Sequence, residues 1–260
     1  MAVVEPVLIG TVALDPNRWG LVTGAREATI EASRWLDALD GAGFDGVELW
    51  EPHLRDADEV EADALLQHHL RTVILNGYAS FLDTAELTAV ATLVDRTGVG
   101  AVKANTGDDP AWLGAEADAA AHWLDELPAG TRLLLECHEG TAIADDHAAA
   151  ARFLARAGPP ERVQSIVHTH EAGDRVRARF DAYGDRITHV HVNQLTDGTA
   201  PPLADVDDFN DRIALLRSLG FTGSWTIEFV HGVLTDHDRP ECLVEQAIAD
   251  LAVLRSALAA

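Results

Sequence analysis

The sequence has little of several features that would assign a protein to a special class. Its two cysteines, Cys137 and Cys242, lie far apart and form no CxxC motif, which favours a reduced, cytoplasmic protein over a secreted one held by disulfides. No apolar run approaches the roughly 18 residues of a membrane span. The N-terminal stretch MAVVEPVLIG has no basic region and is interrupted by Glu5. We therefore expect neither a membrane segment nor a signal peptide.

Positive charge is also scarce. The formal net charge is -24, and such a chain repels nucleic-acid backbones and anionic membranes, so we expect neither as a partner. The basic residues are 18 arginines and a single lysine, Lys103. Arginine does not donate a proton near neutral pH, so the one retained ammonium is a candidate catalytic group. The alternative is that Lys103 persists by chance.

Short apolar runs alternate with longer segments of helical periodicity, which is typical of parallel α/β proteins. The predicted strands are 6–12, 44–50, 71–76, 100–105, 132–138, 163–170, 187–193 and 224–230. The predicted helices are 27–40, 83–97, 111–126, 143–157, 207–219 and 241–257. The segment from Asp83 begins with a capping-box pattern, with Glu86 three residues on, and Gly98 stands where a C-terminal glycine belongs.

Eight strands in 260 residues fit a (β/α)₈ TIM barrel. The alternative is an open, doubly wound sheet, but no GxGxxG motif follows the first predicted strand. We therefore predict an α/β fold in which residues 1–260 form a single TIM-barrel domain.

Polar residues gather at the C-terminal ends of the predicted strands, where TIM barrels carry their chemistry. In strand order, these residues are Glu48 and His53, Asn76, Lys103 and Asn105, Glu136 and His138, His168 and His170, His189 with His191 and Asn193, and Glu228 with His231. The N-terminal ends of the same runs carry nothing comparable. The strand ends therefore predict a polar pocket.

Within the strands, residues two apart share a face, so Glu136 and His138 are expected to point inward together. Carboxylates and imidazoles that converge on one pocket indicate a divalent metal site, and mixed nitrogen and oxygen ligands suit Mn²⁺, Zn²⁺, Fe²⁺ or Co²⁺ better than Ca²⁺. The alternative is a hydrogen-bonded polar core without metal.

Four of these stretches carry a resemblance to a known family: GFDGVELW, LLLECHEGT, ITHVHVN and GSWTIEF. In this order they resemble the xylose isomerase-like TIM barrels, the sugar phosphate isomerase/epimerase superfamily. The resemblance implies a metal held by Glu136, His191 and Glu228, together with an aspartate on the sixth strand. Here that strand reads SIVHTHEAGD and has no aspartate at its end. His168 is the expected substitute and His170 the alternative, which would favour Zn²⁺ or Fe²⁺ over Mg²⁺.

The resemblance further implies an isomerase or epimerase of carbohydrate metabolism that acts on a sugar or polyol ketone. Metal, Mn²⁺ for example, would stabilise an enediolate while Glu136 and Glu228 transfer the proton. Lys103 is a further catalytic candidate. The residues expected to position the substrate are Glu48, His53, Arg18, Asn76 and Asn193.

Three other functions stay open at this point. ECHEGT resembles the Glu-x-His of dehydroshikimate dehydratases, so a lyase of a cyclic keto-acid or keto-polyol is the alternative, with His138 as base. A phosphodiesterase like endonuclease IV is disfavoured by the net charge of -24, and a sugar-binding or metal-storage protein is the non-enzymatic option. Similar barrels often dimerise or tetramerise, so a homo-oligomer is open too.

Overall fold

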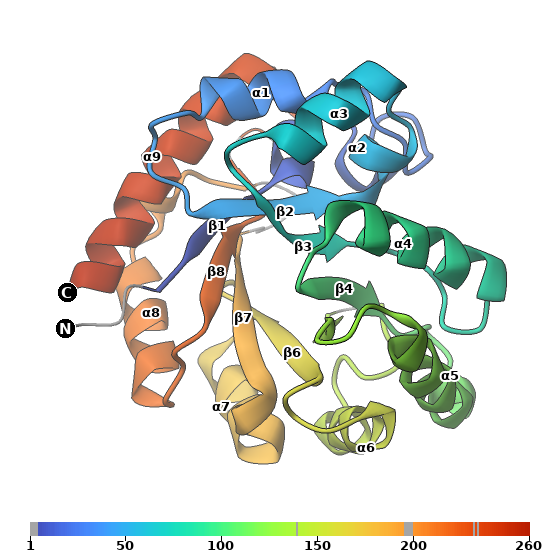
Figure 1. Ribbon diagram of the computed structural model, residues 1–260. Helices are drawn as coiled ribbons and strands as arrows, with labels where there is room; N and C mark the ends of the chain where they lie inside the picture. Colours follow the sequence, from blue (N-terminus) through green and yellow to red (C-terminus); the bar gives the residue numbers. More distant parts are fainter. Residues whose placement is uncertain (1–4, 139, 195–199, 231, 233) are drawn as a thin grey trace. The chain divides into compact units, whose positions relative to one another are not determined.

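The computed structural model describes residues 5–138, 140–194, 200–230, 232 and 234–260. His231, which follows the eighth predicted strand, lies outside these residues. Within the described part, eight strands form a closed barrel in chain order, and their register is parallel (Figure 1). The predicted (β/α)₈ fold is thereby confirmed.

All eight predicted strands are present, but several end earlier than expected. The strands are β1 (Val7–Gly10), β2 (Gly46–Trp50), β3 (Thr72–Asn76), β4 (Ala101–Asn105), β5 (Arg132–Glu136), β6 (Val163–His168), β7 (Ile187–Val192) and β8 (Ser224–Ile227). After Gly10 the chain turns into a 3₁₀ helix, η1 (Thr11–Leu14). Glu228 is the first residue after β8, and His170 lies two residues beyond β6. Residues expected inside strands thus stand on the loops that follow them.

The α-helices are α1 (Ala32–Ala38), α2 (Glu51–Arg55), α3 (Glu59–Gln67), α4 (Thr84–Thr97), α5 (Leu113–Glu126), α6 (His147–Ala157), α7 (Gly173–Tyr183), α8 (Phe209–Ser218) and α9 (Pro240–Ala259). Shorter 3₁₀ helices are η2 (Arg18–Gly20), η3 (Pro110–Trp112), η4 (Gly184–Arg186) and η5 (Leu203–Asp205). Asp83 caps α4 by accepting from the backbone N–H groups of Ala85 and Glu86, and Gly98 ends it in a left-handed conformation with φ 63°. Both predicted ends of this helix are confirmed.

Contacts divide the chain into two compact units. Unit 1 comprises residues up to Thr72, His168–His170 and residues from Val190 onward; unit 2 comprises Val73–Val167 and Glu171–His189. In unit 1, β1 pairs with both β2 and β8, and α9 packs against α1, α8 and β8 (Figure 1). In unit 2, β4 pairs with β3 and β5, while α6 packs between α5 and α7. The single domain expected for 1–260 stays a prediction.

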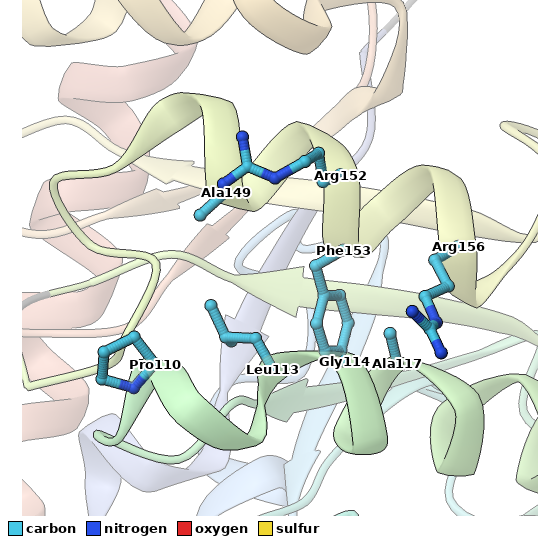
Figure 2. A pocket seen from close by; sticks show the side chains of 8 residues that line it. All are labelled: Pro110, Leu113, Gly114, Ala117, Ala149, Arg152, Phe153 and Arg156. Carbon is cyan, nitrogen blue, oxygen red and sulfur yellow. The ribbon is translucent and has the colours of Figure 1, made fainter.

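A cavity of about 260 Å³ lies between α5 and α6 of unit 2. Figure 2 shows Phe153 of α6 pointing toward Gly114 and Ala117 of α5, with Arg156 pointing toward α5 as well and Arg152 extending toward Ala149. The lining of this cavity contains none of the residues predicted for the polar pocket.

In the described part of the chain, no helix combines the length and the apolar character that a membrane crossing needs.

Candidate metal centre

The polar residues expected at the strand ends are almost fully buried. The side chains concerned are Glu48, Asn76, Lys103, Glu136, His168, His191, Asn193 and Glu228, and each of these residues is between 0% and 3% exposed. Burying an ionised or polar group is costly unless it gains partners inside the protein. The contacts of these side chains therefore indicate which groups compensate their burial.

In unit 1, His191 lies between two carboxylates. Its Nε2 atom is 3.2 Å from both carboxylate oxygens of Glu48. Its Nδ1 atom is 3.2 Å from Oε2 of Glu228. A neutral imidazole has one N–H, so it can donate to one of these carboxylates while its other nitrogen presents a lone pair to the second. A cation beside that second nitrogen would bind the lone pair and the carboxylate together.

Further side chains of unit 1 converge on Glu228. Oε2 of Glu228 is 4.0 Å from Nε2 of His168 and accepts a hydrogen bond of 3.0 Å from Nδ2 of Asn193. The ring centroids of His168 and His191 are 5.2 Å apart, with the rings edge-to-face. His168, His191 and Glu228 each offer one ligand atom, and these atoms lie within 4.8 Å of one another.

These spacings suit a transition metal. Two ligands bound at about 2.1 Å lie about 3.0 Å apart when cis in an octahedron and about 3.4 Å apart in a tetrahedron. The separation of 3.2 Å between His191 Nδ1 and Glu228 Oε2 falls between these values. Two imidazoles and a carboxylate form a mixed nitrogen and oxygen donor set, which suits Zn²⁺, Fe²⁺, Mn²⁺ or Co²⁺ better than Ca²⁺.

The two histidines at the end of β6 have different surroundings. His168 is buried beside His191 and Glu228. His170 is exposed, and its Nδ1 atom contacts Oδ1 of Asn193. Because β6 ends at His168, the alternation expected to place both rings on one face does not reach His170. His168 is therefore the histidine that lies beside His191 and Glu228, and His170 contacts that cluster through Asn193.

In unit 2, Glu136 is the centre of a second polar cluster. Its Oε2 atom lies 2.6 Å from the Lys103 ammonium and accepts a hydrogen bond of 2.9 Å from Nδ2 of Asn105. Parallel pairing of β4 with β5 sets Asn105 directly opposite Glu136. The lone lysine therefore compensates the buried charge of this carboxylate.

Lys103 has two more neighbours. Asn76, expected to bind substrate, stands opposite Lys103 in the register of β3 and β4 and is buried. The lysine ammonium lies 4.1 Å from the centroid of the Tyr78 ring, a cation–π contact. Tyr78 was missed by sequence reasoning, and its place in the loop just after β3 was the available signal.

His138 is the accessible member of this cluster. Its side chain is 41% exposed, and its Nε2 atom lies 3.6 Å from Oε2 of Glu136. The loop that carries it is held from within by Arg179 of α7, which donates to the backbone carbonyl of Cys137 and pairs with Glu171 at 3.1 Å. Burial raises the pKa of the Cys137 thiol, so this cysteine is no nucleophile near neutral pH.

His53 and Arg18, expected to position substrate, contact other protein groups in unit 1. His53 Nδ1 lies 2.9 Å from the Thr11 hydroxyl and Nε2 lies 3.0 Å from Oδ2 of Asp15. Burial alone would raise the pKa of Asp15, but the bonds from His53 and Thr29 outweigh it and hold that pKa below its usual range. Asp15 was not singled out in the sequence, because nothing in its spacing marks it.

Arg18 links the loops that follow β1 and β8. It is fully buried, donates to the backbone carbonyl of Ala13 at 2.9 Å and forms an ion pair with Asp238. Beside it, Trp19 adopts a positive φ of 55° and stacks on Phe229 with 4.1 Å between ring centroids. Phe229 directly follows Glu228, so these contacts hold the start of the loop after β8.

Comparison with known proteins establishes the fold of this chain. No family model matches the sequence, and no curated protein matches it. Among solved structures, D-allulose 3-epimerase from Methylomonas sp. is similar with a TM-score of 0.64 and 18% identity, over 98% of this chain and 99% of that one. The 3-keto-D-glucoside 4-epimerase from E. coli gives a TM-score of 0.63 and 17% identity, over 97% of this chain and 100% of that one.

A third similar structure is a xylose isomerase-like TIM barrel/4-hydroxyphenylpyruvate dioxygenase fusion protein, with a TM-score of 0.65 and 16% identity. The match covers 95% of this chain but 42% of the fusion protein. At these identities the likeness is one of fold. The expected resemblance to the xylose isomerase-like TIM barrels is confirmed at that level.

Proposed function

We propose that the protein is a divalent-metal-dependent isomerase or epimerase of a sugar or polyol ketone. The observation that carries this proposal is the placement of His191 with a carboxylate at each ring nitrogen, beside a second buried histidine. Sugar epimerases among the structures of the same fold support the substrate class.

The proposed ligands are His168, His191 and Glu228 of unit 1, with Glu136 as the fourth ligand that the resemblance of LLLECHEGT implies. A divalent cation held by them would supply Lewis acidity toward a carbonyl oxygen and so acidify the neighbouring C–H bond. The identity of the metal stays open among Mn²⁺, Zn²⁺, Fe²⁺, Co²⁺ and Mg²⁺. Two histidines in the set favour Zn²⁺ or Fe²⁺ over Mg²⁺.

Glu136 and Glu228 are the proposed acid/base pair. One carboxylate removes the proton beside the carbonyl, and the other returns a proton to the opposite face of the same carbon or to its neighbour. Lys103 and Asn105 fix the Glu136 carboxylate through Oε2, and Asn193 fixes that of Glu228. These contacts would hold both carboxylates in a fixed orientation while a substrate binds.

Substrate positioning by Asn76, Asn193, Glu48, His53 and Arg18 stays a prediction, as do the cytoplasmic location and a homo-oligomer. Both His53 and Arg18 are buried, and they bind Asp15 and Asp238. They would therefore position a substrate indirectly, by fixing the loop after β1.

Proton exchange tests the proposal without knowledge of the product. Protein loaded with Mn²⁺ or Zn²⁺ is incubated in D₂O with a panel of unphosphorylated ketopentoses and ketohexoses, and deuterium at the carbon beside the carbonyl is followed by NMR. We expect incorporation into at least one ketose and its epimer or isomer, and none with Glu136→Gln. Glu116→Gln is the matched control, since Glu116 is a buried glutamate that contacts Gly107. Metal-loaded protein that exchanges no ketose would contradict the proposal.

A second candidate is a lyase that removes water from a cyclic keto-acid or keto-polyol. The observation that favours it is the imidazole of His138, which is 41% exposed and lies 3.6 Å from Glu136. A dehydratase forms a conjugated enone, which absorbs in the ultraviolet. Appearance of that band with a cyclic keto-acid, and its loss in His138→Asn, would replace the epimerase by the lyase.

A further inference from the structure

Glu48 and Glu228 contact opposite nitrogens of the same imidazole, but their surroundings differ. Glu48 directs both oxygens at Nε2 of His191, each at 3.2 Å. Glu228 directs Oε2 at Nδ1 and shares that oxygen with Asn193 at 3.0 Å and with His168 at 4.0 Å. Glu48 thus places both oxygens on Nε2, whereas the oxygen that Glu228 places on Nδ1 is shared with an amide and a second buried imidazole.

We infer that Glu48 is a positioning residue: it accepts the Nε2–H of His191 and so turns the Nδ1 lone pair toward a metal bound by Glu228 and His168. This inference rests on the proposed function and assigns Glu48 a role other than the substrate contact expected from the sequence. A histidine that binds metal through one nitrogen commonly donates its other N–H to a carboxylate, which fixes the tautomer and increases ligand basicity. Glu48 is 1% exposed, so solvent screens its charge only weakly.

The competing arrangement places the metal on the Nε2 side of His191, with His189, a buried histidine two residues earlier on β7, as a further candidate ligand. Glu48 would then be a ligand, and Glu228 would orient the ring. The two arrangements share His191 and differ in which carboxylate the metal requires, so single substitutions separate them.

The test measures binding of Co²⁺ to metal-free protein, together with the visible absorption spectrum of the complex, in wild type and in Glu48→Gln, Glu228→Gln, His189→Gln and Glu116→Gln. A glutamine at 48 still accepts the Nε2–H but carries no charge. We expect Glu48→Gln to weaken Co²⁺ binding about 10- to 100-fold while keeping the wild-type spectrum. Glu228→Gln loses stoichiometric binding or changes the spectrum, and His189→Gln and Glu116→Gln keep wild-type affinity.

Each other outcome has a distinct meaning. Loss of the site in both Glu48→Gln and His189→Gln, with Glu228→Gln still binding, overturns the inference in favour of the competing set and leaves metal dependence intact. Unchanged affinity in Glu48→Gln overturns the inference alone. Absence of Co²⁺ and Zn²⁺ binding by wild type overturns the proposed function together with it. Circular dichroism without metal verifies folding, and Glu48→Asp, which keeps the charge, serves as a second variant expected to recover affinity relative to Glu48→Gln.

Discussion

Lys103 and Glu136 illustrate how this interior compensates its buried charges. The sequence marked both residues through their places at strand ends and through the scarcity of lysine. It did not reveal that they form an ion pair of 2.6 Å, because alternation assigns a side chain to a face without giving its partner. The same limit applies to His53 and Arg18: their presence near the strand ends was predictable, whereas their bonds to Asp15 and Asp238 depend on how the loops fold.

The Lys103–Glu136 pair makes a stability prediction. Lys103→Met leaves a buried carboxylate without its ammonium, so we expect the free energy of unfolding to fall by about 3–5 kcal/mol. Denaturant unfolding with EDTA present measures this without interference from bound metal. Arg156→Met is the matched control, because the Arg156–Asp118 pair lies on the surface with both side chains more than half exposed, and we expect no measurable change there. Equal losses from both variants would contradict the assigned role of Lys103.

At the scale of elements, the periodicity of the sequence predicted the strands and the longer helices but missed α2, α3 and α7. The inward face of α7 includes Arg179 and Tyr183 beside Val176, so it gives little apolar signal. In the opposite direction, the first helix was predicted from residue 27 but begins at Ala32. The N–H groups of Ala28 and Thr29 contact the carboxylates of Asp56 and Asp15, and these long-range contacts have no signature in a local pattern.

The contact between η5 and α9 gives a pH-dependent prediction. Asp250 of α9 accepts bonds from the Leu203 N–H and the Gln246 amide, yet burial raises its pKa to about 6. The pKa of an aspartate in an unfolded chain is about 3.9. The folded protein therefore holds a proton that the unfolded chain releases, and this group lowers stability as pH rises from about 4 to about 6.

Asp250→Asn removes that loss, since an amide oxygen can accept the same two bonds. Relative to wild type, we expect the free energy of unfolding of Asp250→Asn to be higher by about 2 kcal/mol more at pH 7.5 than at pH 4. The reason is that the pKa of Asp250 is higher by about 2 in the folded protein than in the unfolded chain. Chemical denaturation at both pH values measures it. Asp63→Asn, at an exposed position of α3, should show no such pH dependence. A gain that is equal at both pH values would show that Asp250 does not titrate as described.

At the scale of the whole molecule, the net charge of -24 bears on stability as well as on partners. Excess charge of one sign destabilises a compact state by self-repulsion, and salt screens this repulsion. We expect the melting temperature in EDTA to rise by several degrees between about 0.02 and 0.5 M NaCl, and by a similar amount in choline chloride. A melting temperature that is constant or falls with salt would contradict this expectation.

The proposed function requires that His168, His191 and Glu228 bind a divalent metal, with Glu136 as the proposed fourth ligand. Elemental analysis of purified wild type, His168→Ala and His170→Ala after incubation with Zn²⁺ or Mn²⁺ tests it most directly. We expect one metal per chain in wild type and in His170→Ala, and substoichiometric metal in His168→Ala. Wild type without metal, or His168→Ala that keeps its metal while His170→Ala loses it, would contradict the account.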